Sequence, residues 1–169
     1  MNPITRPPLQ IVVMGVSGCG KTSIGTLLAS TLGLEFTDGD DLHTQANREK
    51  MAGGIPLDDE DRWPWLDRVG QALNMPGGAV VACSALKRIY RKRILDAAPK
   101  AIFVHLQGDR DLLLRRLNNR ANHFMPPSLL DSQLETLEPL ASGEAGAVVE
   151  VAGSETEILN AVLTQLRSK

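Results

Sequence analysis

The chain has 169 residues, 43% of them hydrophobic and 22% charged, which is typical of one soluble globular domain. Its 18 Lys and Arg against 20 Asp and Glu give a formal net charge of −2, which argues against a nucleic-acid backbone as the main partner. The apolar run Ile11–Val16 is far shorter than the roughly 20 residues that span a bilayer. No secretory signal or disulfide framework is present. We therefore expect a single cytoplasmic domain over residues 1–169, without a membrane partner.

Short β-branched runs alternate along the chain with patterns typical of helices. Residues 1–8 contain three prolines and are expected to form a loose arm. Apolar residues recur at helical spacing in three segments. Gly33 ends the first of them, and Asp109 and Ser154 cap the starts of the other two. Strands separated by helices predict an α/β protein, a three-layer fold in which helices flank a parallel five-stranded sheet. The predicted strands cover residues 9–14, 34–37, 79–83, 101–106 and 147–151.

The first strand runs into Gly15-Val-Ser-Gly-Cys-Gly20-Lys21-Thr22, which fits the pattern G-x-x-x-x-G-K-[ST]. Glycines let successive backbone N–H groups converge on phosphates, and the following helix directs its positive end at them. Lys21 is expected to reach the β- and γ-phosphates, and the Thr22 hydroxyl to ligate Mg²⁺. A plain glycine turn is the alternative, whereas the glycine spacing excludes a dinucleotide fingerprint. The predicted nucleotide-binding residues here are Gly15, Val16, Ser17, Gly18, Cys19, Gly20, Lys21, Thr22 and Ser23.

Other motifs favour a small kinase over a GTPase switch. The one D-x-x-G, Asp67–Gly70, lies in a helix-like stretch, and no N-K-x-D occurs. After the second predicted strand, Asp38, Asp40 and Asp41 offer carboxylates that could organise Mg²⁺ or accept a hydroxyl proton. Extended backbone would place Asp38 and Asp40 on the same side, with Asp41 facing away as a helix cap. The alternative interpretation is a simple turn before a capped helix.

Several segments together resemble the gluconokinases of the phosphate-loop type, over about residues 10–166. They are Asp38-Gly-Asp-Asp-Leu-His43, Asn47, Lys50-Met51, Gly54–Leu57, Asp59, Arg62, Trp65-Leu66, Cys83–Arg91, His123-Phe124, Ser132-Gln133 and Thr136–Glu138. The resemblance implies transfer of the γ-phosphate of ATP to the 6-hydroxyl of D-gluconate. It also implies a nucleoside monophosphate kinase-like fold, a homodimer, a helical substrate-binding region over about residues 43–78 and a small lid over about residues 120–128.

Gluconate is a polyol with one carboxylate, so its pocket needs a cation and several hydrogen-bonding groups. Five basic residues stand between Lys87 and Arg93. On a helix Lys87 and Arg91 share one face, whereas a solvated face is the favoured interpretation of Lys92 and Arg93. The substrate-binding residues that we expect are Asp40, His43, Asn47, Lys50, Arg62, Ser84, Lys87 and Arg91.

Two arginines precede the prolines that break the helix before the lid. The resemblance implies that Arg116 lies over adenine and that Arg120 acts on the transferring phosphate, although both could be solvated. Ser84 stands where many phosphate-loop enzymes carry a second Mg²⁺ aspartate, so we expect Mg²⁺ at Thr22 and Asp38. The expected catalytic residues are Lys21, Asp40 and Arg120. Trp63 and Trp65 are expected to be packing anchors.

Three other functions compete with this assignment. Adenylylsulfate kinase shares an Asp-Gly-Asp motif, but would need a larger aromatic-lined site. Shikimate kinase carries a glycine cluster where this chain has Cys83-Ser-Ala-Leu86. A regulator that binds ATP without turnover is the non-enzymatic alternative.

Overall fold

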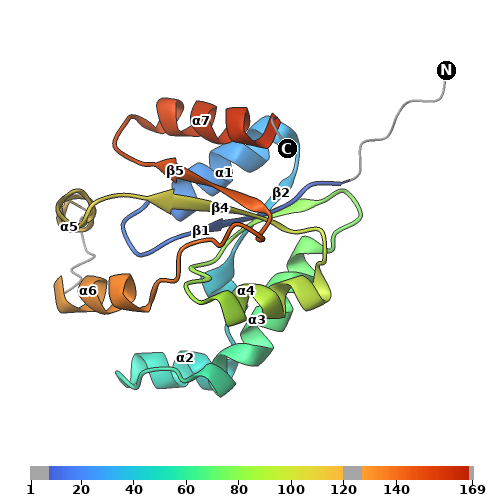
Figure 1. Cartoon of the computed structure of the whole chain (residues 1–169). Helices are drawn as coiled ribbons and strands as arrows, with labels where there is room; N and C mark the ends of the chain where they lie inside the picture. The colour runs from blue at the N-terminus through green and yellow to red at the C-terminus, as the bar shows by residue number, and fades with distance from the viewer. Residues whose placement is uncertain (1–7, 120–126, 168–169) are drawn as a thin grey trace.

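The computed structural model describes residues 8–119 and 127–167. Its centre is a five-stranded sheet in the order β2-β3-β1-β4-β5, and every neighbouring pair is parallel (Figure 1). This confirms the predicted sheet, and the predicted strand ends lie within one residue of those observed. The strands are β1 Gln10–Met14, β2 Glu35–Asp38, β3 Ala79–Ala82, β4 Ile102–Gln107 and β5 Gly146–Glu150.

Helices cover both faces of the sheet, which confirms the three-layer prediction. Helices α1 and α7 pack on one face, and α3 and α4 pack together on the other (Figure 1). The helices are α1 Lys21–Leu32, α2 Gln45–Ala52, α3 Asp59–Leu73, α4 Arg88–Ala97, α5 Arg110–Asn118, α6 Pro127–Thr136 and α7 Glu155–Arg167, with a 3₁₀ helix, η1, at Gly39–Leu42.

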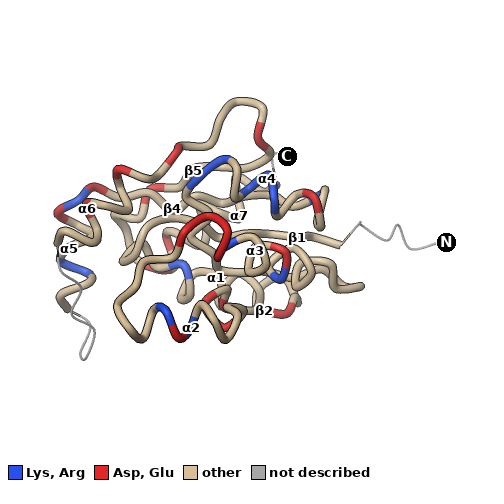
Figure 2. The backbone as a smooth tube through the Cα atoms, turned by 90° about the horizontal axis from the view of Figure 1, so that it is seen from below, with Lys and Arg blue, Asp and Glu red and all other residues tan. Residues whose placement is uncertain are grey.

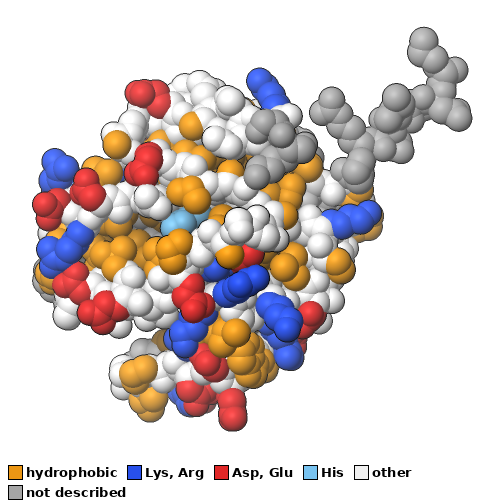
Figure 3. All heavy atoms as spheres, viewed as in Figure 1, with side chains coloured by type: hydrophobic (Ala, Val, Ile, Leu, Met, Phe, Trp, Pro, Cys, Tyr) orange, Lys and Arg blue, Asp and Glu red, His pale blue; other side chains and the backbone are white. Residues whose placement is uncertain are grey.

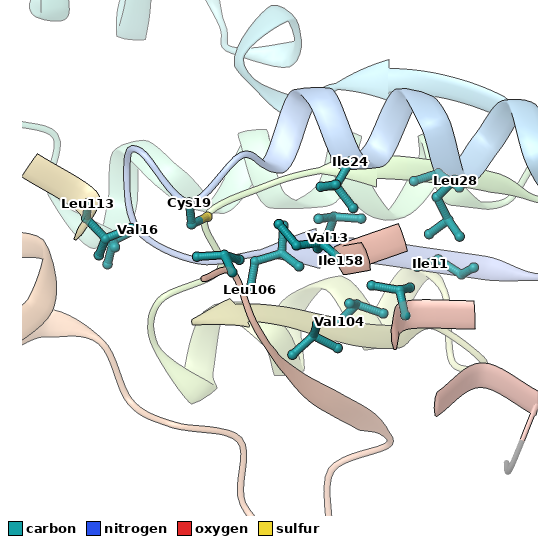
Figure 4. Packing of buried hydrophobic residues seen from close by; sticks show 14 of the residues in the cluster. Ile11, Val13, Val16, Cys19, Ile24, Leu28, Val104, Leu106, Leu113 and Ile158 are labelled. Carbon is teal, nitrogen blue, oxygen red and sulfur yellow. The ribbon is translucent and has the colours of Figure 1, made fainter. Parts of the chain in front are cut away.

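Successive side chains of β1 point alternately into two separate hydrophobic cores. Ile11 and Val13 point into the cluster beneath α1 and α7 (Figure 4), whereas Val12 and Met14 join the cluster against α3 and α4. A strand buried on both faces reads as a continuous apolar run, as the sequence of β1 does. The central strand is therefore fixed from both sides, and so is the loop that leaves it.

The helix ends described here lie where the sequence predicted them, with one exception. Gly33 ends α1 in a left-handed conformation, Asp109 accepts from the Leu112 N–H, and Ser154 accepts from the Glu157 N–H. Asp41, however, caps no helix, and that prediction was wrong. Asp38 caps η1 and Thr44 caps α2, because β2 bends into η1 directly after Asp38.

Candidate functional site

The phosphate loop joins β1 to α1 at the carboxyl edge of the sheet. Gly15, Gly18 and Gly20 have φ angles of 144°, 86° and 91°, a region that suits glycine. A Cβ atom at Gly15 would lie 2.7 Å from the Leu106 carbonyl oxygen. The Lys21 ammonium donates to the Val16 carbonyl across 3.1 Å, so its side chain folds back over the loop. The loop is thus shaped by its backbone to receive an anion.

Beside this loop lies a cavity of about 320 Å³ between α1, α5 and α7. Arg116 lies on its wall, and its guanidinium donates to the carbonyls of Val151 and Gly153. Asn119 and Glu155 also lie on the wall, and no motif in the sequence identified either of them. Arg120 and the predicted lid up to residue 126 lie outside the described residues. The other lining residues are Gly18, Cys19, Gly20, Ser23, Ile24 and Ile158.

Asp38, the last residue of β2, contacts the phosphate-loop helix. The Thr22 hydroxyl donates to Asp38 Oδ2 across 3.0 Å, and Asp38 Oδ1 accepts from the Asp40 N–H, also at 3.0 Å. We expected extended backbone to place Asp38 and Asp40 on the same side, but the strand ends at Asp38, because η1 begins at the next residue. Asp40 itself is exposed. Two hard oxygen atoms, of Thr22 and Asp38, therefore lie together near an exposed acidic residue.

Two close backbone approaches bring this acidic turn and the end of β3 to the phosphate loop. A Cβ atom at Gly39 would lie 2.3 Å from the Ala82 carbonyl oxygen, so only glycine fits where η1 crosses β3. The Gly15 N–H donates to the Ser84 carbonyl across 3.3 Å. Ser84, predicted as a substrate contact, thus stands at the start of the phosphate loop.

Residues predicted to bind substrate make contacts at the first turn of α3. Asp58 and Asp61 form a reciprocal capping box. The Lys50 ammonium donates to both carboxylate oxygens of Asp61 at 2.9 and 2.8 Å. This bond raises the pKa of Lys50 and lowers that of Asp61. Lys50 is therefore a paired cation, not a free one.

Arg62 and Lys87 meet at one acid and one phenol. The Tyr90 hydroxyl donates to Asp59 across 2.5 Å, and Arg62 donates to that hydroxyl across 3.2 Å. The Lys87 ammonium lies 3.6 Å from Asp59 and over the Tyr90 ring. Burial, with the bond to Asp59, raises the pKa of Tyr90 to about 12. Basic and acidic side chains are interleaved over α3 and α4 on the face shown in Figure 3.

His43, which follows η1, and Asn47, on α2, lie together and are both buried. His43 stacks on Trp65, with ring centroids 4.3 Å apart, and Asn47 Nδ2 lies 3.2 Å from His43 Nδ1. The Trp65 indole donates to the Gly39 carbonyl across 2.7 Å. Trp63 packs edge-on against Tyr90. Both tryptophans are packing anchors, as predicted, and Trp65 ties α3 to the acidic turn. We call the residues on η1, α2, the first turn of α3 and the β3–α4 connection the acceptor wall.

Arg91 does not face the site, and its prediction as a substrate contact was wrong. Its guanidinium is fully buried, donates to both oxygens of Glu144 at 2.7 and 3.1 Å, and also bonds the carbonyls of Ala85 and Leu86. The helical-face argument failed because Lys87 precedes α4 in extended conformation, so the two side chains diverge. Burial pushes the pKa of Glu144 upward, but the bonds from Arg91 and Ala141 outweigh it and hold this pKa low. Arg91 is a structural anchor for the connection that carries Ser84 and Lys87.

Helix α6 and the segment after it bond both halves of the site. Gln133 accepts from the Ser17 N–H across 2.8 Å. Glu138 accepts from the Arg88 N–H, and its own N–H donates to Leu86, both at 2.7 Å. Sequence reasoning matched Gln133 and Glu138 to the family but gave them no role, because their partners lie about 50 or more positions away.

Within residues 8–119 and 127–167, no group of three or more His, Cys, Asp or Glu side chains is arranged to hold a metal. The helices in the same part of the chain are too short or too polar to cross a membrane. Lys and Arg are interspersed with Asp and Glu along the described part of the chain (Figure 2).

Comparison with known proteins places this chain in a family. The shikimate kinase family model matches residues 17–167. Gluconokinase of Gluconobacter oxydans (strain 621H) is 47% identical, over 88% of this chain and 84% of the relative. Thermosensitive gluconokinase of Escherichia coli (strain K12) is 47% identical, over 76% of this chain and 71% of the relative. The crystal structure of a gluconokinase from Sinorhizobium meliloti 1021 is 46% identical, with a TM-score of 0.89 over 96% of this chain and 94% of that one.

The competing kinases are more distant. An adenylylsulfate (APS) kinase of Mycobacterium tuberculosis and a shikimate kinase of Acinetobacter baumannii are each 20% identical, with TM-scores of 0.66 and 0.65. At that identity the likeness concerns the fold alone, and it confirms the phosphate-loop kinase architecture. The chain therefore belongs to the gluconokinase family, within the shikimate kinase group of phosphate-loop kinases.

Proposed function

We propose that this protein transfers the γ-phosphate of ATP to the 6-hydroxyl of D-gluconate, giving 6-phospho-D-gluconate and ADP. The observation that carries the proposal is the placement of a phosphate loop directly beside the acceptor wall. That wall combines cations, an exposed carboxylate and neutral hydrogen-bonding groups, which is what a polyol carboxylate needs. The gluconokinase relatives at 47% identity support the same acceptor.

ATP would lie with its phosphates in the loop and its base in the neighbouring cavity. Residues 15–23 then supply backbone N–H groups to the phosphates, and Lys21 leaves the Val16 carbonyl to pair with the β- and γ-oxygens. Arg116, held by two carbonyls on the cavity wall, would cover the adenine. Arg120, assigned to the transferring phosphate, remains a prediction because it lies outside the described residues.

Thr22 and Asp38 would hold Mg²⁺, which supplies charge neutralisation at the phosphates when it is bound. The donor set fits, since the hydroxyl and carboxylate oxygens lie 3.0 Å apart and both are hard ligands. Two protein oxygens suit an ion that keeps several waters and takes its remaining ligands from the nucleotide. Mg²⁺ dependence of the rate is the expected consequence.

Asp40 is the residue that we assign as proton acceptor. The 6-hydroxyl oxygen attacks the γ-phosphorus, the bond from that phosphorus to the β–γ bridging oxygen breaks, and ADP leaves with the bridging oxygen. The hydroxyl proton passes to the Asp40 carboxylate late in the transfer. The Asp40 N–H is held by Asp38, so the two carboxylates keep separate positions.

The acceptor would be held by the groups of the wall. Arg62 and Lys87 are the cations that we assign to its carboxylate, because they converge where Asp59 and Tyr90 already fix them. His43, Lys50 and Ser84 are assigned to its hydroxyl groups. The amide nitrogen of Asn47 bonds His43 and the Asp61 carbonyl, so it acts on the acceptor through its neighbours, and the amide oxygen stays assigned to the acceptor itself.

An ADP-release assay coupled to NADH oxidation tests the assignment. The purified chain is given MgATP with gluconate, shikimate, adenylylsulfate or no acceptor. We expect fastest turnover with gluconate, and phosphorus NMR of the product should show a phosphomonoester on C6. Fastest turnover with shikimate or adenylylsulfate would replace the acceptor, and ATP binding without any turnover would indicate a regulator.

The assembly and location that the family suggests are also proposals. We propose a homodimer, which sedimentation equilibrium would distinguish from a monomer. We also propose a cytoplasmic enzyme acting as one domain. The free, buried thiols of Cys19 and Cys83 support a reducing compartment, and fractionation of the source cells would check it.

A further inference from the structure

One contact fixes the orientation of a buried amide on the acceptor wall. Asn47 is buried, and its Nδ2 atom lies 2.9 Å from the backbone carbonyl oxygen of Asp61. A carbonyl oxygen only accepts hydrogen bonds, so the group that faces it must be the amide NH₂. Turning the amide would bring two oxygens together. Asn47 therefore presents its nitrogen, not its oxygen, toward this side.

The same nitrogen lies 3.2 Å from Nδ1 of His43. An amide NH₂ group donates and does not accept, so Nδ1 must be the acceptor in this contact. A ring nitrogen that accepts carries no proton, and a neutral imidazole then has its proton on Nε2. Asn47 thus selects one of the two neutral tautomers of His43.

The charged groups around His43 also keep its ring neutral. Burial lowers the pKa of His43, Asp40 on η1 opposes that effect, and Arg48 on α2 and Arg62 on α3 add to the lowering. A second proton, on Nδ1, would face the Asn47 NH₂ group and leave two donors in contact. His43 is therefore poorly suited to take a proton at neutral pH.

The ring is fixed in place, with one nitrogen open. It stacks on Trp65 at an interplanar angle of 13°, and its backbone carbonyl accepts from Arg48 and Arg68. Within the described part of the chain, the buried side-chain nitrogens and oxygens that lack a partner belong to Gln10 and His105. Nε2 of His43 is not one of them, and no described residue bonds it, so it has accessible surface.

We propose that Asn47 is a positioning residue that locks His43 as the neutral Nε2–H tautomer, and that His43 donates a hydrogen bond from Nε2 to an oxygen of the polyol acceptor. The proton of the attacking hydroxyl then goes to Asp40 and never to His43. The inference rests on the proposed function for the identity of the acceptor. The tautomer does not rest on it, because protein contacts alone determine it.

The tautomer is measured on the wild-type protein without substrate. Two-bond ¹H–¹⁵N spectra of the histidine rings, with His43→Gln used for assignment, distinguish a protonated nitrogen from an unprotonated one. We expect Nδ1 unprotonated and Nε2 protonated from pH 6.5 to 8. A proton on Nδ1, or an imidazolium at pH 7, overturns the inference whether or not gluconate is the substrate.

The donor role is tested by two substitutions at His43. Glutamine places an N–H group near the position of Nε2 but does not titrate, whereas phenylalanine keeps only the stacking on Trp65. We expect His43→Phe to raise the gluconate KM about tenfold or more, the effect of a lost hydrogen bond, with the ATP KM unchanged. His43→Gln should recover most of that loss. Equal losses of kcat in both variants, together with disappearance of the wild-type fall in rate on the acid side of the pH profile, would instead make His43 a base.

Asn47→Asp tests the positioning role. A carboxylate only accepts, so it should draw the proton to Nδ1, raise the pKa of His43 and remove the donor at Nε2 from the neutral ring. We expect a changed ring spectrum and a gluconate KM that depends on pH between 6 and 8. Gln71→Glu, the same change of amide to carboxylate at an exposed position of α3 outside the acceptor wall, should leave both unchanged. An Asn47→Asp ring spectrum identical to that of the wild type would contradict the positioning role.

Discussion

The two sides of the site are built in different ways. On the nucleotide side, β1, the phosphate loop and α1 form one continuous stretch of chain, and positive-φ glycines shape the loop. The acceptor wall instead gathers η1, α2, α3 and the β3–α4 connection, which side-chain bonds join across distant positions. A side chain lost from the loop should therefore remove one function and leave the cradle intact. A side chain lost from the wall should disturb several neighbours.

The largest expected effect is at Asp40. Asp40→Asn keeps the size of the side chain but removes the acceptor charge, so kcat should fall by roughly 10²–10⁴-fold with ATP binding intact. Asp38→Asn should instead raise the Mg²⁺ concentration needed for half-maximal rate. Mg²⁺ titrations at saturating gluconate, with direct ATP-binding measurements, separate the two residues. Near-normal kcat in Asp40→Asn would exclude it as the base, and equal losses that metal restores would make the pair a joint Mg²⁺ site.

The buried pair of Arg91 and Glu144 shows how the wall depends on distant partners. Glu144→Ala leaves a fully buried guanidinium without its carboxylate, which should lower the free energy of unfolding by about 3–5 kcal/mol. Urea denaturation measures this loss. The double variant Arg91→Met/Glu144→Ala should be more stable than Glu144→Ala, because no unpaired charge remains. A loss below about 1 kcal/mol in Glu144→Ala, the size typical of exposed pairs, would show that the pair is not an anchor.

On the nucleotide side we expect the opposite result, because a substitution at Lys21 should reduce activity and leave stability unchanged. Lys21→Met removes one charge that stabilises the transferring phosphate, so kcat should fall by roughly 10²–10³-fold. The free energy of unfolding should stay within about 0.5 kcal/mol of the wild type, because the backbone cradle remains. A kcat above about a tenth of the wild-type value, less than about 1.4 kcal/mol of barrier, would remove Lys21 from the mechanism.

This difference also explains what the sequence could and could not predict. The five strands and the phosphate loop were predictable, because β-branched runs and the spacing from Gly15 to Thr22 are local signals. The caps at Asp109 and Ser154 were predictable for the same reason. The wrong cap at Asp41 came from assuming that β2 stays extended past Asp38.

The acceptor wall could be predicted only as a set of residue types. Lys87 and Arg91 look alike in the sequence, but one pairs with Asp59 at the surface and the other with Glu144 in the interior. Those acids lie 28 and 53 positions away, so no spacing rule identifies them. The sequence pattern likewise did not identify the partners of Asn47, which include a backbone carbonyl.

Lys87 is a partially exposed cation, in contrast to the buried Arg91. Lys87→Ala removes one of the two cations assigned to the gluconate carboxylate, which should raise the gluconate KM roughly tenfold and leave the ATP KM unchanged. Lys92→Ala, on the exposed side of α4, is the matched control and should change neither constant. An unchanged gluconate KM in Lys87→Ala would mean that this ammonium serves only Asp59 and Tyr90.

The smallest expected effect concerns the two histidines that are buried among the described residues. His43 has Asn47 as a partner, whereas both ring nitrogens of His105, on β4, are buried without a partner among the described residues. Burial, and then the charge of Arg91, lower the pKa of His105. The folded protein therefore binds this proton less readily than the unfolded chain does, so its contribution to stability is complete above pH 6.5 and is lost as the pH falls below that value.

Acidification from pH 7.5 to 5.5 should thus lower the free energy of unfolding by at most about 1.4 kcal/mol on account of His105. His105→Leu should remove this part of the loss and should be at least as stable as the wild type at pH 7.5, because two unpartnered ring nitrogens are replaced by an apolar side chain. His43→Gln removes the separate contribution of His43, and the double variant should show the flattest dependence. Urea denaturation at both pH values measures each term. If His105→Leu loses as much stability on acidification as the wild type, the ring of His105 already finds a partner for its proton in the folded state.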